Sequence, residues 1–140
     1  MSDQILNKVK SGIDPEDLKD LALRLVRRPS PQTELLEYEP QVKSFVSETL
    51  VYELKGRGIS NVTLDEMGNL ICRIGPRDAA KKLFFLGYAM NHPASSMTDP
   101  YKGEIVDVEG RQAIRGRGIA EQKGSLAAMI AAADFVNRHS

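Results

Sequence analysis

A glycine-punctuated segment, residues 116–124, runs directly into an apolar helix, and this combination constrains the fold more than any other feature. The segment reads Gly-Arg-Gly-Ile-Ala-Glu-Gln-Lys-Gly, and glycines allow a backbone to adopt positive φ angles or to approach a neighbour closely. The helix predicted from Ser125 to about Arg138 carries apolar residues around most of its circumference. Because this face is too wide for a surface helix, it must be covered on more than one side.

The same segment contains a candidate binding residue. Its lone carboxylate, Glu121, precedes the N-terminus of the predicted helix, a position that suits a ligand for a metal ion or a substrate. The alternative is a surface turn that merely contains charged residues. The candidate residues around this carboxylate are Gly116, Arg117, Gly118, Lys123 and Gly124.

Length and charge limit the classes of function. The 140 residues fit one domain, and a hydrophobic content of 41% is enough for a core. Nineteen basic residues balance nineteen acidic ones, so no global field attracts nucleic acid or an acidic membrane. No apolar run reaches the roughly 18 residues that span a bilayer, and the N-terminus lacks a secretory pattern. We therefore expect a cytoplasmic protein with no nucleic-acid or membrane partner.

The single cysteine excludes an internal disulfide and a cysteine-based metal cluster. Cys72 lies in the stretch Leu-Ile-Cys-Arg-Ile, residues 70–74, where we expect a buried structural thiol rather than a nucleophile.

Helix signals are clear in the first part of the chain. Asp14 can cap a helix that begins at Pro15 and ends before Pro29. A second helix is predicted from Glu39 or Pro40 to Lys55, where glycines end it. Residues 1–12 are expected to form a loosely ordered segment, and residues 13–140 a single partial α/β domain without a complete second domain.

Two β-hairpins are predicted, one from 61–66 and 70–74 and one from 104–108 and 111–115. Between them, the continuous apolar run 83–86 is typical of a strand that is buried on both faces of a sheet. This run leads into residues 87–93, and in open α/β sheets ligands gather where strands end at their carboxyl edge.

Taken in order, these segments resemble the N-terminal part of the catalytic domain of the aminoacylase, acetylornithine deacetylase and carboxypeptidase family of dinuclear zinc hydrolases. The resemblance extends from about Leu18 to Val136. It implies an α/β fold, a partial three-layer sandwich like the first half of a zinc-peptidase catalytic domain. The motifs that carry it are Arg28-Pro29-Ser30, Gly68-Asn69-Leu70, the run into Gly87 and Pro93, Asp99 to Ile105, and Gly116-Arg117-Gly118 with Lys123-Gly124.

The chain departs from this family at the metal ligands. After the apolar strand the family carries Gly-His-x-Asp, in which the histidine binds zinc and the aspartate orients it. Tyr88 and Met90 stand at these two positions. Tyrosine, with a pKa of about 10, is a poor zinc ligand near neutral pH, and methionine cannot accept the hydrogen bond that orients a ligating imidazole. Glu121 falls at the bridging aspartate and keeps a carboxylate.

The resemblance implies zinc or another divalent metal, although these substitutions leave open that the chain binds none. His92, four residues after Tyr88, could reach a shifted metal ion, or it could be a loop residue hydrogen-bonded to backbone. His139 is expected to be solvated.

Three functions remain open. The chain could be a truncated or split hydrolase of amide or peptide bonds in small N-acylated amino acids; it lacks the later paired glutamates and histidine and would not be competent alone. It could be a non-catalytic binding or assembly subunit on the same scaffold. Least expected is an active enzyme that combines His92 and Glu121 with residues of a partner. The expected partners are a small-molecule substrate, if active, and a missing C-terminal portion or a partner chain.

Overall fold

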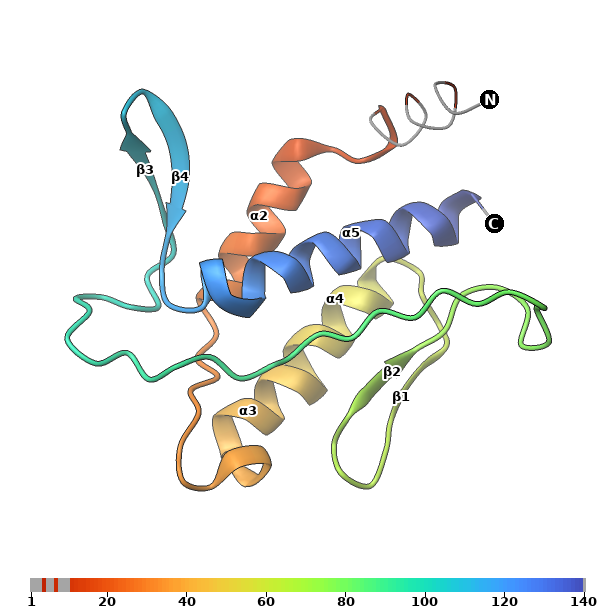
Figure 1. Cartoon of the computed structure of the whole chain (residues 1–140), viewed down its shortest axis with the longest axis horizontal. Coiled ribbons are helices and arrows are strands. Elements are labelled where there is room, and N and C mark those ends of the chain that lie inside the picture. The colour runs from red at the N-terminus through yellow and green to blue at the C-terminus, as the bar shows by residue number, and fades with distance from the viewer. Residues whose placement is uncertain (1–3, 5–6, 8–10, 140) are drawn as a thin grey trace.

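The computed structural model describes residues 4, 7 and 11–139 (Figure 1). The predicted order of helices and hairpins is confirmed. Most of the segment 1–12 lies outside the described residues. The elements are α2 (Pro15–Val26), η1 (Leu36–Tyr38), α3 (Pro40–Ser44), η2 (Phe45–Leu50), α4 (Val51–Gly56), β1 (Val62–Leu64), β2 (Leu70–Cys72), β3 (Glu104–Val108), β4 (Arg111–Arg115), η3 (Ile119–Lys123) and α5 (Gly124–His139).

Helix α2 begins as its capping residues predict. The Asp14 carboxylate accepts a hydrogen bond from the backbone N–H of Glu16 at 3.0 Å, and Pro15 occupies the first turn. The apolar stripe of the helix faces the core, where Leu21 and Leu25 are fully buried. Local capping and a one-sided apolar pattern therefore suffice to explain this helix.

The second predicted helix is continuous from Pro40 to Gly56, but its middle turns, η2, are π-helical. The apolar residues expected to face inward are all buried. They are Val42, Phe45, Val46, Leu50 and Leu54.

Both hairpins form in the predicted positions. Strand β1 pairs antiparallel with β2, and β3 pairs with β4 from Glu104↔Arg115 to Val108↔Arg111. Glu109 and Gly110 both have positive φ angles, 54° and 77°, as a two-residue turn of the primed type requires. Among the described residues each hairpin is a separate two-stranded sheet.

The prediction of a buried Cys72 is wrong, because the residue is exposed at the end of β2. In residues 4, 7 and 11–139, the short hairpin has no further strand beside it, and none of these residues covers the Cys72 side chain closely enough to bury it. Neighbouring atoms still desolvate the sulfur enough to raise the pKa of its thiol.

The core lies where α2, the helix 40–56 and α5 pack against one another (Figure 1). Helix α5 contributes Leu126, Ala127, Ile130 and Ala131, all of which are buried. Val136, on the same helix, is 49% exposed. The wide apolar surface of α5 is thus covered along only part of its length.

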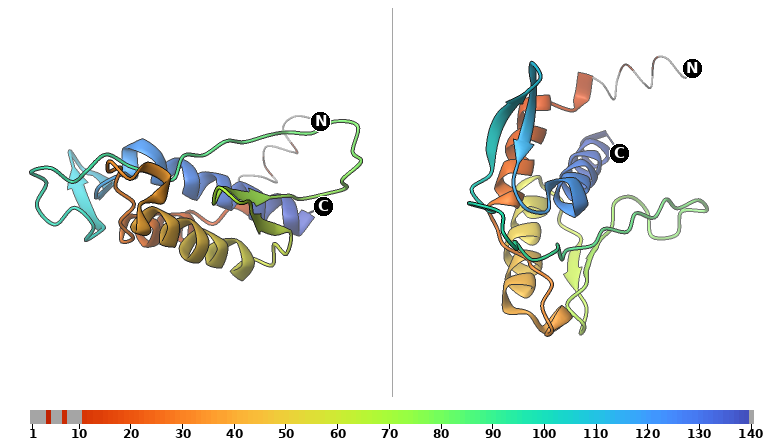
Figure 2. Two further views of the ribbon diagram at one scale, coloured as in Figure 1. Left: turned by 90° about the horizontal axis from the view of Figure 1, so that it is seen from below. Right: turned by 60° about the vertical axis from the view of Figure 1, so that its left-hand side comes forward.

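The apolar run 83–86 does not form the predicted buried strand. Leu83, Phe84, Phe85 and Leu86 are 82%, 83%, 62% and 80% exposed, and the segment passes along the outside of the helices (Figures 1 and 2). A strand needs a neighbour for its backbone hydrogen bonds, and both hairpins pair only internally. The extended chain meets one neighbour further on, at an isolated parallel bridge between Pro31 and Asn91.

The helices and small sheets are consistent with part of an α/β domain. The three-layer sandwich stays a prediction. Within the part of the chain that the structure describes, no helix combines the length and the apolar character needed to cross a bilayer.

Candidate functional site

The candidate site forms where the loop 87–93 meets the turn that leads into α5. Gly118 begins this turn with a φ of 86°, and its carbonyl accepts hydrogen bonds from the backbone N–H groups of Gln122 (3.0 Å) and Lys123 (2.9 Å). A Cβ atom on Gly118 would lie 3.1 Å from Cβ of Asn91. Both the backbone angle and the close approach therefore favour glycine at this position.

Glu121 links the turn to the loop. Its Oε2 accepts a hydrogen bond from the backbone N–H of His92 at 2.9 Å, and its Oε1 lies 3.5 Å from Nη1 of Arg117. Arg117 also donates from Nε to the carbonyl of Pro93 at 2.9 Å, and from Nη2 to the same oxygen. The structure thus brings together three of the sequence-predicted residues, Arg117, Glu121 and His92, although His92 takes part through its backbone.

The other side of the loop rests on two buried polar residues that were not among the candidate site residues. Ser30 is fully buried, and its hydroxyl lies 2.8 Å from the carbonyl oxygen of Ala89 and 3.0 Å from Oδ1 of Asn91. The Asn91 side chain, also buried, donates to the carbonyl of His92 at 2.7 Å. Ser30 belongs to the Arg-Pro-Ser motif of the resemblance, which was the one available signal for it.

Lys123 lies in the core, and no pattern in the sequence predicts this burial. The residue is fully buried, and its ammonium donates to the carbonyl of Arg28. The ammonium also lies 5.0 Å from the ring centroid of Phe45 and 5.5 Å from that of Tyr101, distances typical of cation–π contacts. Burial lowers the pKa of Lys123 to about 8, while the charge of Glu121 acts in the opposite direction.

Tyr88 and Met90 contact each other on the loop. The hydroxyl of Tyr88 lies 3.8 Å from Sδ of Met90, and Tyr88 is 48% exposed. His92 is exposed, and His139, near the C-terminal end of α5, is exposed and bonded within its own helix to the carbonyl of Phe135. The hydrogen bond between His92 and Glu121 thus uses the backbone N–H of His92 and not its imidazole.

The residues present do not fit a dinuclear zinc centre. Zinc in proteins is bound by thiolate, imidazole and carboxylate groups, with about three protein ligands at a catalytic ion. No three or more such side chains cluster in the ranges 4, 7 and 11–139 that the structure describes. Both oxygens of Glu121 already face N–H donors, and the phenol of Tyr88 faces a thioether.

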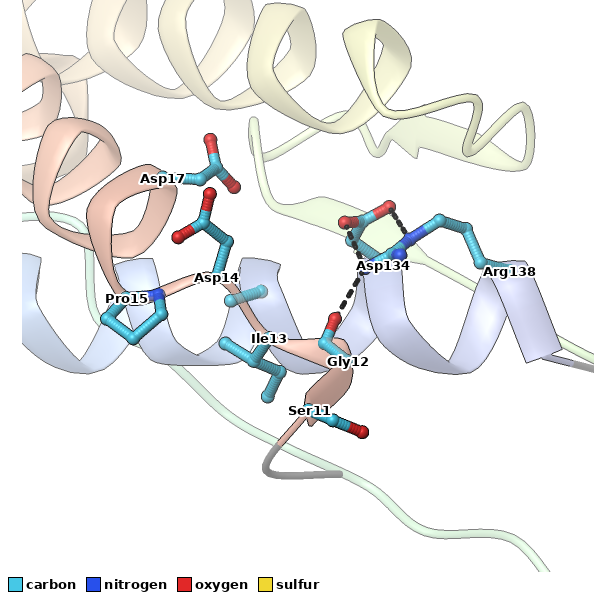
Figure 3. Close-up of a pocket in the computed structure, with 9 residues that line it drawn as sticks. Ser11, Gly12, Ile13, Asp14, Pro15, Asp17, Asp134 and Arg138 are labelled. Carbon is cyan, nitrogen blue, oxygen red and sulfur yellow. Dashed lines mark hydrogen bonds and ion pairs between the residues drawn. The ribbon is translucent and has the colours of Figure 1, made fainter. Parts of the chain in front are cut away.

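A separate pocket of about 470 Å³ lies near the other end of α5, between that helix and residues 11–17 (Figure 3). Arg138 pairs with Asp134 at 3.1 Å and donates to the carbonyl of Gly12 at 3.0 Å. Asp17 is bound by Arg57 at 2.7 and 2.9 Å, and this hydrogen bonding lowers the pKa of Asp17. Arg57 also lies 3.5 Å from Asp134, so it links α2 to α5 through two carboxylates. We therefore assign the pocket a structural role.

Comparison with known proteins adds two relatives. Succinyl-diaminopimelate desuccinylase of Acinetobacter baylyi is 31% identical over 128 residues, which cover 88% of this chain and 31% of the relative. The protein of the same name from Shewanella pealeana is 30% identical over 134 residues, which cover 92% of this chain and 32% of the relative. The chain thus spans about a third of the length of the curated relatives it matches.

No family model matches the chain, and no solved structure matches it. The two desuccinylase matches nevertheless extend over most of its length, including the loop 87–93 and the turn with Glu121. They support the hydrolase superfamily that the motifs resemble, without singling out a family within it.

Proposed function

We propose that this chain carries the N-terminal scaffold of a hydrolase of amide bonds in small N-acylated amino acids, and that its 140 residues do not catalyse the reaction alone. The first half of the proposal is supported by the two relatives, both named as desuccinylases of succinyl-diaminopimelate. It is also supported by the order of motifs from Arg28 to Lys123. The expected substrate is accordingly a small molecule, and the expected compartment is the cytoplasm.

The claim that the chain does not catalyse the reaction alone depends chiefly on one observation: both oxygens of the Glu121 carboxylate already face protein donors. Hydrolysis by a metal-bound water needs a metal held by about three protein groups, with one position left open. Glu121 instead accepts from the backbone of His92 and faces Arg117. Tyr88 and Met90, which stand where the resembled family has its histidine and aspartate, contact each other. Zinc or another divalent ion is therefore implied by the resemblance, and not by the donors of this chain.

A direct assay tests the second half, and a positive result would also bear on the first. The purified chain is incubated with N-succinyl and N-acetyl amino acids in the presence of Zn²⁺, Co²⁺ or Mn²⁺, and the released amine is measured. We expect no rate above that of the same metal in buffer. Metal-dependent turnover that disappears in Glu121→Ala would contradict the second half of the proposal and establish the first.

A binding or assembly role is the second candidate, and the exposed run 83–86 favours it. Four consecutive apolar side chains in contact with water form the kind of patch that marks protein interfaces. The extended backbone there also has hydrogen-bonding groups available for an added strand. A partner chain that supplies such a strand, or the counterpart of the relatives' remaining length, would cover the run.

Mass measurement in solution examines this second candidate. We expect the wild-type chain to form assemblies larger than a monomer, and the double variant Phe84→Asp, Leu86→Asp to be monomeric. A soluble, well-folded wild-type monomer with no exposed apolar patch would count against a missing partner. The third function is an active enzyme that combines His92 and Glu121 with residues of a partner. Metal analysis of any complex, with wild-type chain and with His92→Ala, tests it. An unchanged metal content would show that the His92 side chain is not a metal ligand.

A further inference from the structure

We propose that Glu121 is a metal-independent clamp, which closes the loop 87–93 onto the turn before α5 with protein donors alone. In the resembled hydrolases the matching carboxylate bridges two metal ions. In this chain the same position is bound by the backbone N–H of His92 and by the guanidinium of Arg117. The clamp holds two segments of the fold together, whether or not the chain takes part in amide hydrolysis.

The contacts form a closed set. Glu121 accepts a hydrogen bond from the N–H of His92 at 2.9 Å. Arg117 donates from two nitrogens to the carbonyl oxygen of the next residue, Pro93. The two side chains lie 3.5 Å apart and are only 28% and 24% exposed. The two side chains of one ion pair thus bond one backbone group on each of two successive loop residues. Hydrogen bonds to charged groups are stronger than those between neutral groups.

The turn fixes both side chains of the ion pair. The backbone N–H of Arg117 donates to the carbonyl of Pro100 at 2.6 Å, and that of Glu121 donates to Gly118 at 3.3 Å. With the backbone held at these points, the extra methylene of glutamate, relative to the family's aspartate, gives its carboxylate the reach to the N–H of His92. Shortening the side chain by one carbon–carbon bond, about 1.5 Å, would open a 2.9 Å hydrogen bond beyond its useful range.

A metal ion would compete for the same oxygens. Cations bind carboxylate lone pairs, and here those of Glu121 point at one N–H donor and one guanidinium. The guanidinium also places a positive charge 3.5 Å from the carboxylate, which repels a divalent cation. The clamp therefore replaces a metal bridge with an ion pair and a backbone hydrogen bond.

The role of the His92 backbone allows a matched pair of variants. His92→Ala keeps the N–H that Glu121 binds, whereas His92→Pro removes it. We expect thermal unfolding to show an unchanged midpoint for His92→Ala. A fall of about 3 to 6 °C is expected for His92→Pro and for Glu121→Asp, as the loss of one charge-assisted hydrogen bond predicts. Glu66→Asp, in an exposed turn, is the control for the shortened side chain.

Chelation completes the test. We expect EDTA to leave the wild-type midpoint unchanged, and Arg117→Lys, which keeps the charge but loses the forked donation, to lower it. A wild-type midpoint that falls when EDTA is added would overturn the proposal. So would a fall for His92→Ala as large as that for His92→Pro, or an unchanged midpoint for Glu121→Asp or for Arg117→Lys. Because the readout is stability, a failed or successful amide-hydrolysis assay does not alter its outcome.

Discussion

The turn before α5 and the run 83–86 reverse the usual relation between hydropathy and burial. Lys123, a cation, is fully buried, whereas Leu83, Phe84 and Leu86 each expose 80% or more of their surface. The ammonium of Lys123 donates to the carbonyl of Arg28 and lies near the rings of Phe45 and Tyr101. The apolar run finds neither a paired strand nor a covering layer among the described residues. Burial in this chain thus follows the availability of packing partners more closely than residue polarity.

Two phenylalanines provide the sharpest test of this contrast. Phe45 is 1% exposed and Phe84 is 83% exposed. Phe45→Ala should cost about 3–5 kcal/mol of the free energy of unfolding, because it leaves a cavity in the core. Phe84→Ala should change it by less than about 0.5 kcal/mol. Denaturant unfolding measures both, and a large loss for Phe84→Ala would show that the run is covered in solution.

The buried ammonium predicts an unusual dependence of stability on pH. Because the pKa of Lys123 is about 8 in the folded chain and about 10.5 when unfolded, the unfolded chain binds more protons between these values. Stability should therefore rise with pH across this window, by up to about 3 kcal/mol. It is lost as the pH falls from 10.5 through 8.

Comparison with Lys123→Met isolates this effect from the titration of tyrosines. The difference in unfolding free energy between wild type and variant should change between pH 8 and 10.5 and be flat below pH 7. A constant difference across the whole range would show that the ammonium is solvated rather than buried.

A buried carboxylate with a good partner extends the comparison to ion pairs. Glu53 is 7% exposed and receives two hydrogen bonds from Arg24, at 2.7 and 3.0 Å. Glu53→Ala should cost about 2 kcal/mol in chemical denaturation. The exposed pair of Arg115 and Glu104 offers the control, and Arg115→Ala should cost less than about 0.5 kcal/mol. Equal costs would mean that the burial of Glu53 adds nothing to its ion pair.

The smallest expected effect is at Cys72. Since the residue is exposed, Cys72→Ser should alter the unfolding free energy by no more than about 0.5 kcal/mol. A maleimide should label the native thiol, more slowly than a free thiol at neutral pH because the pKa of Cys72 is raised. If the thiol reacted only after unfolding, Cys72 would be buried in solution, as the sequence predicts.

Features set by neighbouring residues in the chain could be predicted. The cap at Asp14, the turn at Glu109 and Gly110, and the pairing of each hairpin depend on residues close in sequence, and all three form as expected. The apolar face of the helix 40–56 is equally a local pattern, and its members are buried.

Features that depend on distant partners could not be predicted. The sequence alone does not reveal that the Lys123 ammonium contacts the carbonyl of Arg28, 95 residues away. Nor does it reveal that the run 83–86 lacks a neighbouring strand within the described part of the chain. At the candidate site, the sequence points to Glu121 and Arg117. It does not show that their loop partner is the backbone of His92 rather than its imidazole, since a backbone donor leaves no trace in residue identity.

Zinc titration of the chelator-treated chain, followed by calorimetry, tests most directly whether protein donors alone hold Glu121. We predict no saturable binding to the wild-type chain and an identical trace for Glu121→Ala. Stoichiometric zinc binding by the wild type that is lost in Glu121→Ala would show that the carboxylate is a metal ligand, and would contradict the clamp.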